Sequence, residues 1–192
     1  MAVHPETGRT YLGDALGMRV MEFHPESGQW QTYPMGERVG AMGHLAMDGQ
    51  GNLLLSDPAR HCVHFLCANP GADANAAGLL DSVETLLGSP GQPGYLDGPM
   101  EACRLNRPSG LLYLPGIDAL VLTDTGNDAL RMLRNTPEGY SVHTLATAQD
   151  VGWTAPDRVI GLGADGFLVR SALAATGAHR PSPSRSYLRR SR

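Results

Sequence analysis

One aspartate recurs at the same place in three similar stretches of the chain, at Asp14, Asp57 and Asp124. Each follows a short apolar run and stands where a tight turn opens. A carboxylate in this position can act as a general acid or base, but it can also accept hydrogen bonds from backbone amides two or three residues further on. Because a catalytic group is expected once in a chain and not once per repeat, we predict a structural turn role for all three.

Histidine and cysteine gather in one short stretch, where His61 and His64 flank Cys62, and Cys67 follows. These side chains are typical zinc ligands. On a strand, however, residues three apart point to opposite faces, so His61 and His64 cannot converge on one ion. The chain also lacks a second Cys-x-x-Cys or His-x-x-x-His half. We therefore expect structural or surface roles for this stretch, and neither a metal nor a cofactor.

A glycine-rich stretch begins at Gly88. A phosphate-binding loop would end in Gly-Lys followed by Ser or Thr, and the chain has no lysine. We therefore interpret residues 88–105 as a connection between two repeated units. It carries a candidate interaction loop made of Gly91, Gly94, Tyr95 and Asp97. No Gly-x-Ser-x-Gly elbow occurs, so a hydrolase triad has no support and no catalytic residue is assigned.

The elements that would position these residues come from an internal repeat. Gly43–Leu66 and Gly110–Leu133 align without a gap over 24 residues, with seven identical positions and the aspartates in register. Thr10–Phe23 and Pro156–Ser171 repeat parts of the pattern, although Ala172 stands at the aspartate position of the last copy. Self-similarity of this kind is typical of repeat architectures.

Each unit reads as four short strands separated by turns, with the aspartate at the end of the second strand. Four antiparallel strands per unit are the blade of a β-propeller. We therefore predict an all-β fold, a partial propeller of about three and a half four-stranded blades. The predicted units are about 1–39, 40–87, 106–147 and 156–172, followed by a disordered basic tail at 173–192.

The two ends of this arc differ from its middle. We expect about three strands in the first unit, which begins at its second strand, and about two in the fourth. An open arc leaves the outer faces of both end blades without a neighbour. We therefore expect the chain to self-associate through its end blades or to be a fragment of a longer protein.

Three stretches resemble the NHL repeat: LLGSPGQPGYLDGP (86–99), RLNRPSGLLYL (104–114) and LVLTDTGNDALRML (120–133). The positions that match the family's pattern are Pro108, Gly110, Asp124, Gly126 and Asn127. Leu105 replaces an aromatic residue, and Asp128 replaces the usual histidine. FHPESGQWQTYPM (23–35) also resembles streptogramin lyase-like propellers. The resemblance implies a propeller in which Asn127 is a structural turn residue, and it is nearly silent on activity.

Charge is unevenly distributed along the chain, whose formal net charge is −4. All 15 basic residues are arginine, and five of them lie in the last 13 residues. Residues 1–179 therefore hold ten arginines against 19 acids, a net charge of −9. An acidic body repels a phosphate backbone, so we expect no binding of nucleic acid.

Nothing in the sequence indicates a membrane or a secretory route. No run of 18 or more apolar residues occurs, and residues 1–14 lack the apolar centre of a signal peptide. The odd count of three cysteines fits reduced thiols. We therefore expect no membrane contact and an intracellular, cytoplasmic protein.

The function that these features favour is an interaction scaffold, which presents the turn-rich rims of its repeats to a protein partner. The alternative is a propeller enzyme of the lactonase, lyase or strictosidine synthase-like kind. The two differ in their polar residues. An enzyme gathers non-repeating polar side chains at one place, whereas the polar residues of a scaffold recur with the repeat.

Overall fold

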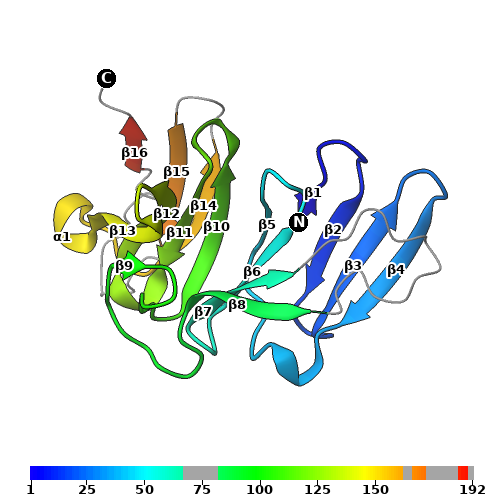
Figure 1. Cartoon of the computed structure of the whole chain (residues 1–192), viewed down its shortest axis with the longest axis horizontal. Coiled ribbons are helices and arrows are strands. Elements are labelled where there is room, and N and C mark those ends of the chain that lie inside the picture. Colours follow the sequence, from blue (N-terminus) through cyan, green and yellow to red (C-terminus); the bar gives the residue numbers. More distant parts are fainter. Residues whose placement is uncertain (67–81, 162–165, 172–185, 190–192) are drawn as a thin grey trace, which may run out of the picture.

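The computed structural model describes residues 1–66, 82–161, 166–171 and 186–189. Within these ranges the chain forms four antiparallel sheets that follow one another along the sequence (Figure 1). Each sheet corresponds to one predicted repeat, and the sheets are named blades 1 to 4 here. This arrangement confirms the predicted all-β class and the partial propeller built from blades.

In blades 1 and 2 the strands lie side by side in the order of the sequence. Blade 1 consists of β1 (Ala2–Val3), β2 (Thr10–Asp14), β3 (Arg19–His24) and β4 (Gln29–Pro34). Blade 2 consists of β5 (Leu45–Met47), β6 (Leu53–Asp57), β7 (Cys62–Leu66) and β8 (Val83–Gly88). A short 3-10 helix, Gly36–Arg38, lies between the two blades.

Blade 3 has an additional strand at its outer edge, where β9 (Gly98–Pro99) pairs with β13. Its other strands are β10 (Pro108–Leu114), β11 (Ala119–Asp124), β12 (Ala129–Thr136) and β13 (Gly139–Thr147). Blade 4 consists of β14 (Pro156–Gly161), β15 (Gly166–Ser171) and β16 (Ser186–Arg189). The remaining elements are the helix α1 (Ala148–Val151) and the 3-10 helices Pro115–Ile117 and Thr125–Asn127.

Three strands differ from the predicted pattern. β1 gives blade 1 a fourth strand, β16 gives blade 4 a third, and β9 lies within the predicted connection 88–105. β1 and β9 have two residues each, which is too short for any alternation of apolar and polar side chains. β16 comes from the predicted tail and pairs with β15 through its backbone, which composition does not reveal. The rest of that tail lies outside the described residues.

Apolar side chains of neighbouring blades meet face to face and form the core. Leu55 packs toward blade 1, and its counterpart Leu122 packs toward blade 2. Val63 and Leu130, which the aligned repeats make equivalent, are fully buried and each faces the following blade, and Val20 does the same in blade 1. The register of the internal repeat is therefore confirmed by the packing of its side chains.

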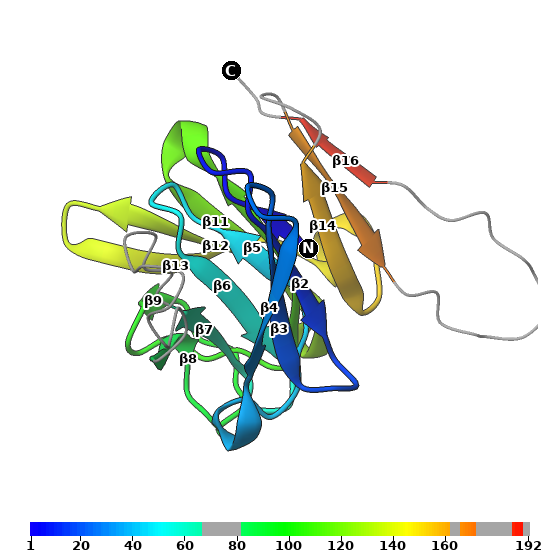
Figure 2. The same cartoon turned by 90° about the vertical axis from the view of Figure 1, so that its right-hand side faces the viewer.

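The first strands of the blades are neighbours in space. β1 contacts β5, β5 contacts β10, and β10 contacts β14. Figure 2 shows the N-terminus close to β14. The amino group of Met1 is partly buried, and this burial together with the charge of Arg158 on β14 lowers its pKa. The blades therefore curve, so that blades 1 and 4 approach each other at their inner strands. In the described part of the chain, no helix is long and apolar enough to cross a membrane.

Candidate functional site

Asp57 joins the end of β6 to the loop that leads into blade 2. Its Oδ1 accepts hydrogen bonds from the amides of Ala59 and Arg60 in the turn, at 3.1 and 3.0 Å, and from the amide of Ala41 at 3.0 Å. Its Oδ2 accepts the amide of Gly40 at 2.6 Å. Burial opposes ionisation, but the hydrogen bonds to the carboxylate outweigh it and lower the pKa of Asp57. The carboxylate is thus engaged by the backbone on both oxygens.

Asp124 occupies the equivalent position at the end of β11, but its partners differ. Oδ1 accepts the amide of Asn106, in the loop before blade 3, at 2.7 Å. Oδ2 accepts the side chains of Asn127 at 2.7 Å and Arg131 at 2.8 Å. In the described residues, no amide of the following turn bonds to Asp124, because that turn is a 3-10 helix closed by its own backbone. Burial dominates here and raises the pKa of Asp124.

Asp14 and Asn127 complete the set of predicted turn residues. Asp14 accepts the amide of Gly17 at 2.9 Å and the guanidinium of Arg19 at 2.8 Å, and these bonds lower its pKa. The amide group of Asn127 donates to Asp124 and, at 2.8 Å, to the carbonyl of Gly94. Asp14 and Asn127 are thus both hydrogen-bonded to backbone groups of neighbouring loops or turns.

The loops before blades 3 and 4 are each held by a hydrogen bond to a turn residue of the preceding blade. His61 and Asp128 are equivalent turn residues, and both have left-handed backbone, with φ of 61° and 50°. His61 Nδ1 accepts the amide of Arg107 at 3.1 Å, and Asp128 Oδ1 accepts the amide of Ala155 at 2.5 Å. Asp128, which departs from the NHL pattern, therefore makes the contact that histidine makes one blade earlier.

The candidate interaction loop contacts both blade 2, through Gly91 and Arg60, and blade 3, through Asp97 and Arg131. Gly91 and Gly94 donate their amides to backbone carbonyls at 3.0 Å. Asp97 accepts a hydrogen bond from Arg131 at 2.6 Å, and the Tyr95 ring lies 4.8 Å from the same guanidinium. Arg131 is fully buried, so the loop covers its charge. Asp97 and the Tyr95 hydroxyl are also bonded to Thr144 on β13, while 44% of the Asp97 side chain and 53% of Tyr95 stay exposed.

Three potential metal ligands converge between blades 1 and 2. Asp57, Cys62 and His64 are buried, and their ligand atoms lie within 4.8 Å of one another. His64 Nε2 is 3.1 Å from Asp57 Oδ2 and 3.6 Å from Cys62 Sγ. Burial and the charge of Asp57 raise the pKa of Cys62 to about 12, so the sulfur is a neutral thiol. In blade 3 the equivalent pair is Arg131 with Asp124, which makes His64 the counterpart of a structural side chain.

The histidines and cysteines that gather in the sequence between His61 and Cys67 do not form one group, in line with the expectation that His61 and His64 do not converge. His61 bonds to the backbone of the next blade, and Cys67 lies outside the described residues. The member that sequence reasoning missed is Asp57, which pairs with Cys62 across the β6–β7 turn. The hairpin register between these strands was the signal that could have placed them together.

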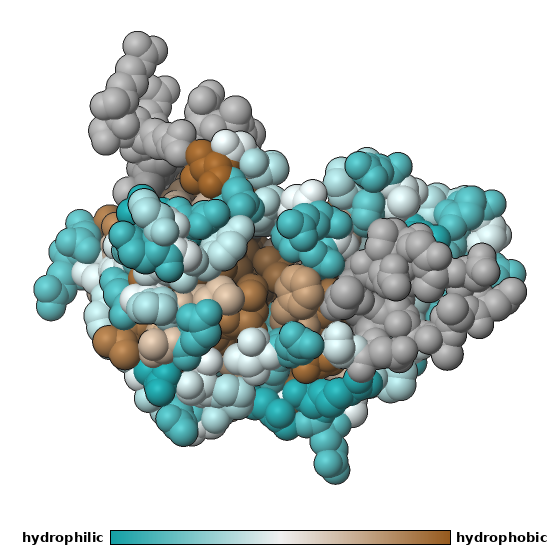
Figure 3. Space-filling model, in the orientation of Figure 1, coloured by the Kyte–Doolittle hydropathy of each residue, from teal (hydrophilic) through white to brown (hydrophobic). Residues whose placement is uncertain are grey.

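A cleft of about 250 Å³ lies between blades 2 and 3. Figure 3 shows apolar side chains gathered in this hollow, with polar side chains around it. Buried leucines from the facing sides of the two blades form its floor, and turns at one end of the blades form its rim. The lining residues are Asp48, Gly49, Gln50, Leu54, Phe65, Leu86, Met100, Tyr113, Asp118, Leu120, Leu133 and Tyr140.

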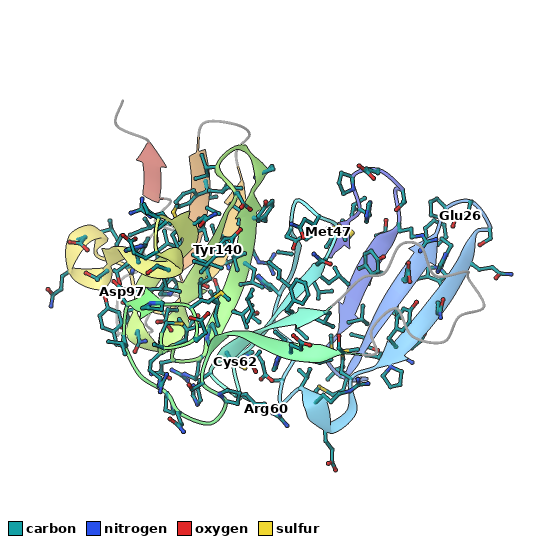
Figure 4. The ribbon with its side chains drawn as sticks, viewed as in Figure 1. Glu26, Met47, Arg60, Cys62, Asp97 and Tyr140 are labelled. Atoms are coloured by element: carbon teal, nitrogen blue, oxygen red, sulfur yellow. The ribbon has the colours of Figure 1, made fainter. Side chains whose placement is uncertain are left out.

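Two tyrosines and one carboxylate form a network at the rim. Tyr113 and Tyr140 donate hydrogen bonds to the two oxygens of Asp118, at 2.7 and 2.8 Å. These bonds lower the pKa of Asp118, while burial and the bond to Asp118 raise the pKa of Tyr113 to about 12. Gly49 lets the facing turn approach, because a Cβ atom there would lie 2.8 Å from the Tyr113 hydroxyl. Figure 4 labels Tyr140 in blade 3.

A second carboxylate lies on the opposite side of the cleft. Asp48 Oδ1 accepts the amides of Gln50 and Asn52, both at 2.9 Å, which fixes the β5–β6 turn. The sequence patterns did not point to the cleft or to Asp48. One signal was available in the continuous apolar run Leu53–Leu55, because a strand that is apolar on both faces packs against a neighbour on each face.

No family model and no curated protein matches the chain. Solved structures do match it. An auxiliary nutrient binding protein from Bacteroides ovatus aligns with 19% identity over 88% of this chain and 44% of its own, with a TM-score of 0.66. A protein of unknown function from Bacteroides thetaiotaomicron aligns with 19% identity over 88% and 43%, with a TM-score of 0.68. Virginiamycin B lyase from Staphylococcus aureus aligns with 11% identity over 98% and 54%, with a TM-score of 0.53.

The fold is a partial β-propeller. At these identities the similarity shows the fold alone, because one fold serves many functions. The chain spans less than half the length of the two Bacteroides structures. The blade arrangement is what this chain has in common with them.

Proposed function

We propose that this chain is an interaction scaffold of NHL-like propeller blades, and that it presents the cleft between blades 2 and 3 to a protein partner. The observation that carries this proposal is an apolar floor below a polar rim in a cleft between two blades. Concave sites lined by apolar and aromatic side chains, with a few placed polar groups, are typical of binding sites.

The polar residues at the blade ends support a scaffold more than an enzyme. Asp57 and Asp124 recur with the repeat, as do His61 and Asp128, and all four accept backbone amides. A carboxylate or imidazole used in this way is committed to structure and is not available for acid-base catalysis. The Asp118 network does not recur and lies in the cleft, so it is the feature that favours the alternative, a propeller enzyme.

Selection from a displayed random peptide library, with the full chain immobilised, tests the scaffold. Gln50→Trp blocks the cleft, because Gln50 is exposed on the β5–β6 turn and lines the cleft. Gln29→Trp is the matched control, since Gln29 is an exposed residue of β4 in blade 1. We expect enriched peptides that bind the wild type and Gln29→Trp but lose most of their affinity for Gln50→Trp.

Two results would contradict the scaffold. One is a selection that enriches no sequence above the background of the support. The other is a set of peptides that bind Gln50→Trp as tightly as the wild type, since these would occupy a surface other than the cleft.

We also propose that the outer face of blade 1 associates with a second copy of the chain. Phe23 and Trp30 pack with their ring centroids 5.0 Å apart on this face, and Trp30 is 53% exposed. Exposed aromatic residues that pack together on the face of a sheet are typical of association surfaces. Light scattering should show a concentration-dependent dimer that Trp30→Glu reduces. A wild-type chain that stays monomeric at every concentration would contradict this part of the proposal.

A further inference from the structure

We propose that the cleft binds a peptide segment in which an apolar side chain is flanked by arginine or lysine. This inference rests on the proposed function and adds the chemistry of the partner to it. The floor accepts the apolar side chain. Leu54, Leu120 and Leu133 line the cleft but are only 3%, 2% and 6% exposed, so the apolar surface that a ligand can cover comes mainly from the partly buried Phe65, Leu86 and Met100.

The rim accepts the flanking charge. Asp118 is exposed at the mouth, and two tyrosine hydroxyls hold its oxygens without neutralising its charge. Asp48 adds a second carboxylate, and among the lining residues that the structure describes no basic side chain balances the two. Carboxylates beside an apolar floor attract cations and disfavour an acidic partner.

The aromatic residues of the rim suit the same ligand. Tyr140 is 40% exposed and lies with Tyr113 beside Asp118, so a guanidinium can contact ring faces and a carboxylate together. The chain itself contains this combination, since the guanidinium of Arg131 bonds to Asp97 and lies 4.8 Å from the Tyr95 ring centroid. The charge of −9 carried by residues 1–179 adds a longer-range attraction for a basic partner.

Calorimetric titration of the full chain with two matched peptides tests the proposal. The first is acetyl-Gly-Arg-Leu-Arg-Gly-amide, and in the second both arginines are citrulline, which has nearly the same shape and no charge. We expect the arginine peptide to bind about tenfold more tightly, from about threefold for each contact with a rim carboxylate. The advantage should shrink at high salt, because surface charges are screened. Replacing the leucine with alanine should weaken both peptides.

Substitutions at the rim assign the effect to named groups. Asp118→Asn keeps the size of the side chain and an acceptor for the tyrosines, and it should remove about threefold of the arginine advantage. It should leave the affinity of the citrulline peptide nearly unchanged. Glu26→Gln is the control, because this carboxylate is 57% exposed on blade 1, far from the cleft (Figure 4). Thermal unfolding of each variant verifies that the fold is retained.

The outcomes separate this inference from the proposed function. Equal affinities for the two peptides, both lost in Gln50→Trp, would overturn the preference for charge and leave the scaffold intact. Binding that Gln50→Trp does not change would overturn both. If neither peptide binds, the inference is overturned, and the library selection still decides the scaffold. Binding that weakens as the protein concentration rises would assign the cleft to a second copy of the chain and would also overturn the inference.

Discussion

Blades 2 and 3 hold the same carboxylate, at the end of the second strand, in two different ways. In blade 2, Asp57 accepts four backbone amides and lies 3.1 Å from His64 Nε2. In blade 3, Asp124 accepts one backbone amide, and its remaining partners are side chains, including the guanidinium of Arg131. The repeated sequence therefore specifies where the carboxylate lies and not what binds it.

The partners of each carboxylate depend on the loop before its blade. Arg131 is buried because the connection 88–105 supplies Asp97 and the Tyr95 ring to its other side. In the described residues, blade 2 has no such connection, and the smaller His64 stands in the place of the arginine. The pKa values follow the partners, since that of Asp57 is lowered and that of Asp124 is raised by burial. A longer loop thus allows a buried ion pair in one blade, and backbone amides suffice in the other.

Arg131→Met should produce the largest loss of stability in this comparison. It leaves Asp124 buried at 0% exposure without its cation, and breaking a buried pair by removing one partner costs about 3–5 kcal/mol. Urea unfolding of the variant measures the loss. The double variant Arg131→Met with Asp124→Asn is the control, and it should recover part of the loss because the uncompensated charge is gone. A single variant as stable as the wild type would show that the pair is not a structural element.

Asp57→Ala should cost less, because no buried cation is left behind. The amides of Gly40, Ala41, Ala59 and Arg60 lose their acceptor, and such a set of unpaired donors, partly reached by water, costs about 2–3 kcal/mol. Urea unfolding again gives the change. Asp57→Asn keeps one carbonyl oxygen and should lose less than Asp57→Ala. Equal losses in the two variants would mean that charge, and not the backbone bonds, carries the contribution of Asp57.

The fold was predictable where local patterns are sufficient. Strand alternation, turn residues and the 67-residue offset placed Asp57 and Asp124 at the ends of their strands, and Val63 and Leu130 on the same face. Each of these signals lies within one hairpin, where side-chain period and turn chemistry decide the structure. Very short strands such as Gly98–Pro99 have no period to detect, and they form because an edge strand offers unpaired backbone groups.

The candidate site was less predictable, because several of its residues are distant in the sequence. Tyr140 lies 22 positions after Asp118, and Asp97 lies 34 positions before Arg131. No local spacing rule joins such residues. The interaction loop illustrates the same limit: its glycines and Asp97 stand out in the sequence, but the buried guanidinium that binds Asp97 does not.

The opposite pKa directions of the two aspartates predict opposite pH dependences. The lowered pKa of Asp57 contributes stability above the unfolded value of about 3.9, and this contribution is lost as the pH falls through the folded pKa. The raised pKa of Asp124 contributes stability below about 3.9, and this is lost as the pH rises through the folded pKa. Stability measured against pH for wild type, Asp57→Asn and Asp124→Asn checks the signs. Parallel curves for the two variants would contradict the difference between the blades.

The smallest effect is expected at the turn residue that differs between the blades. Asp128→Ala leaves the amide of Ala155 without its acceptor and should cost about 1 kcal/mol, the ordinary value for one partly buried hydrogen bond. Asp128→His should change stability by less than about 0.5 kcal/mol, the range of tolerated surface substitutions. The reason is that His61, with the same left-handed backbone, accepts the equivalent amide of Arg107 through Nδ1. Urea unfolding of both variants measures the difference. If histidine destabilises blade 3 as much as alanine does, the two residues are not interchangeable, and the loops before blades 3 and 4 are held by different means.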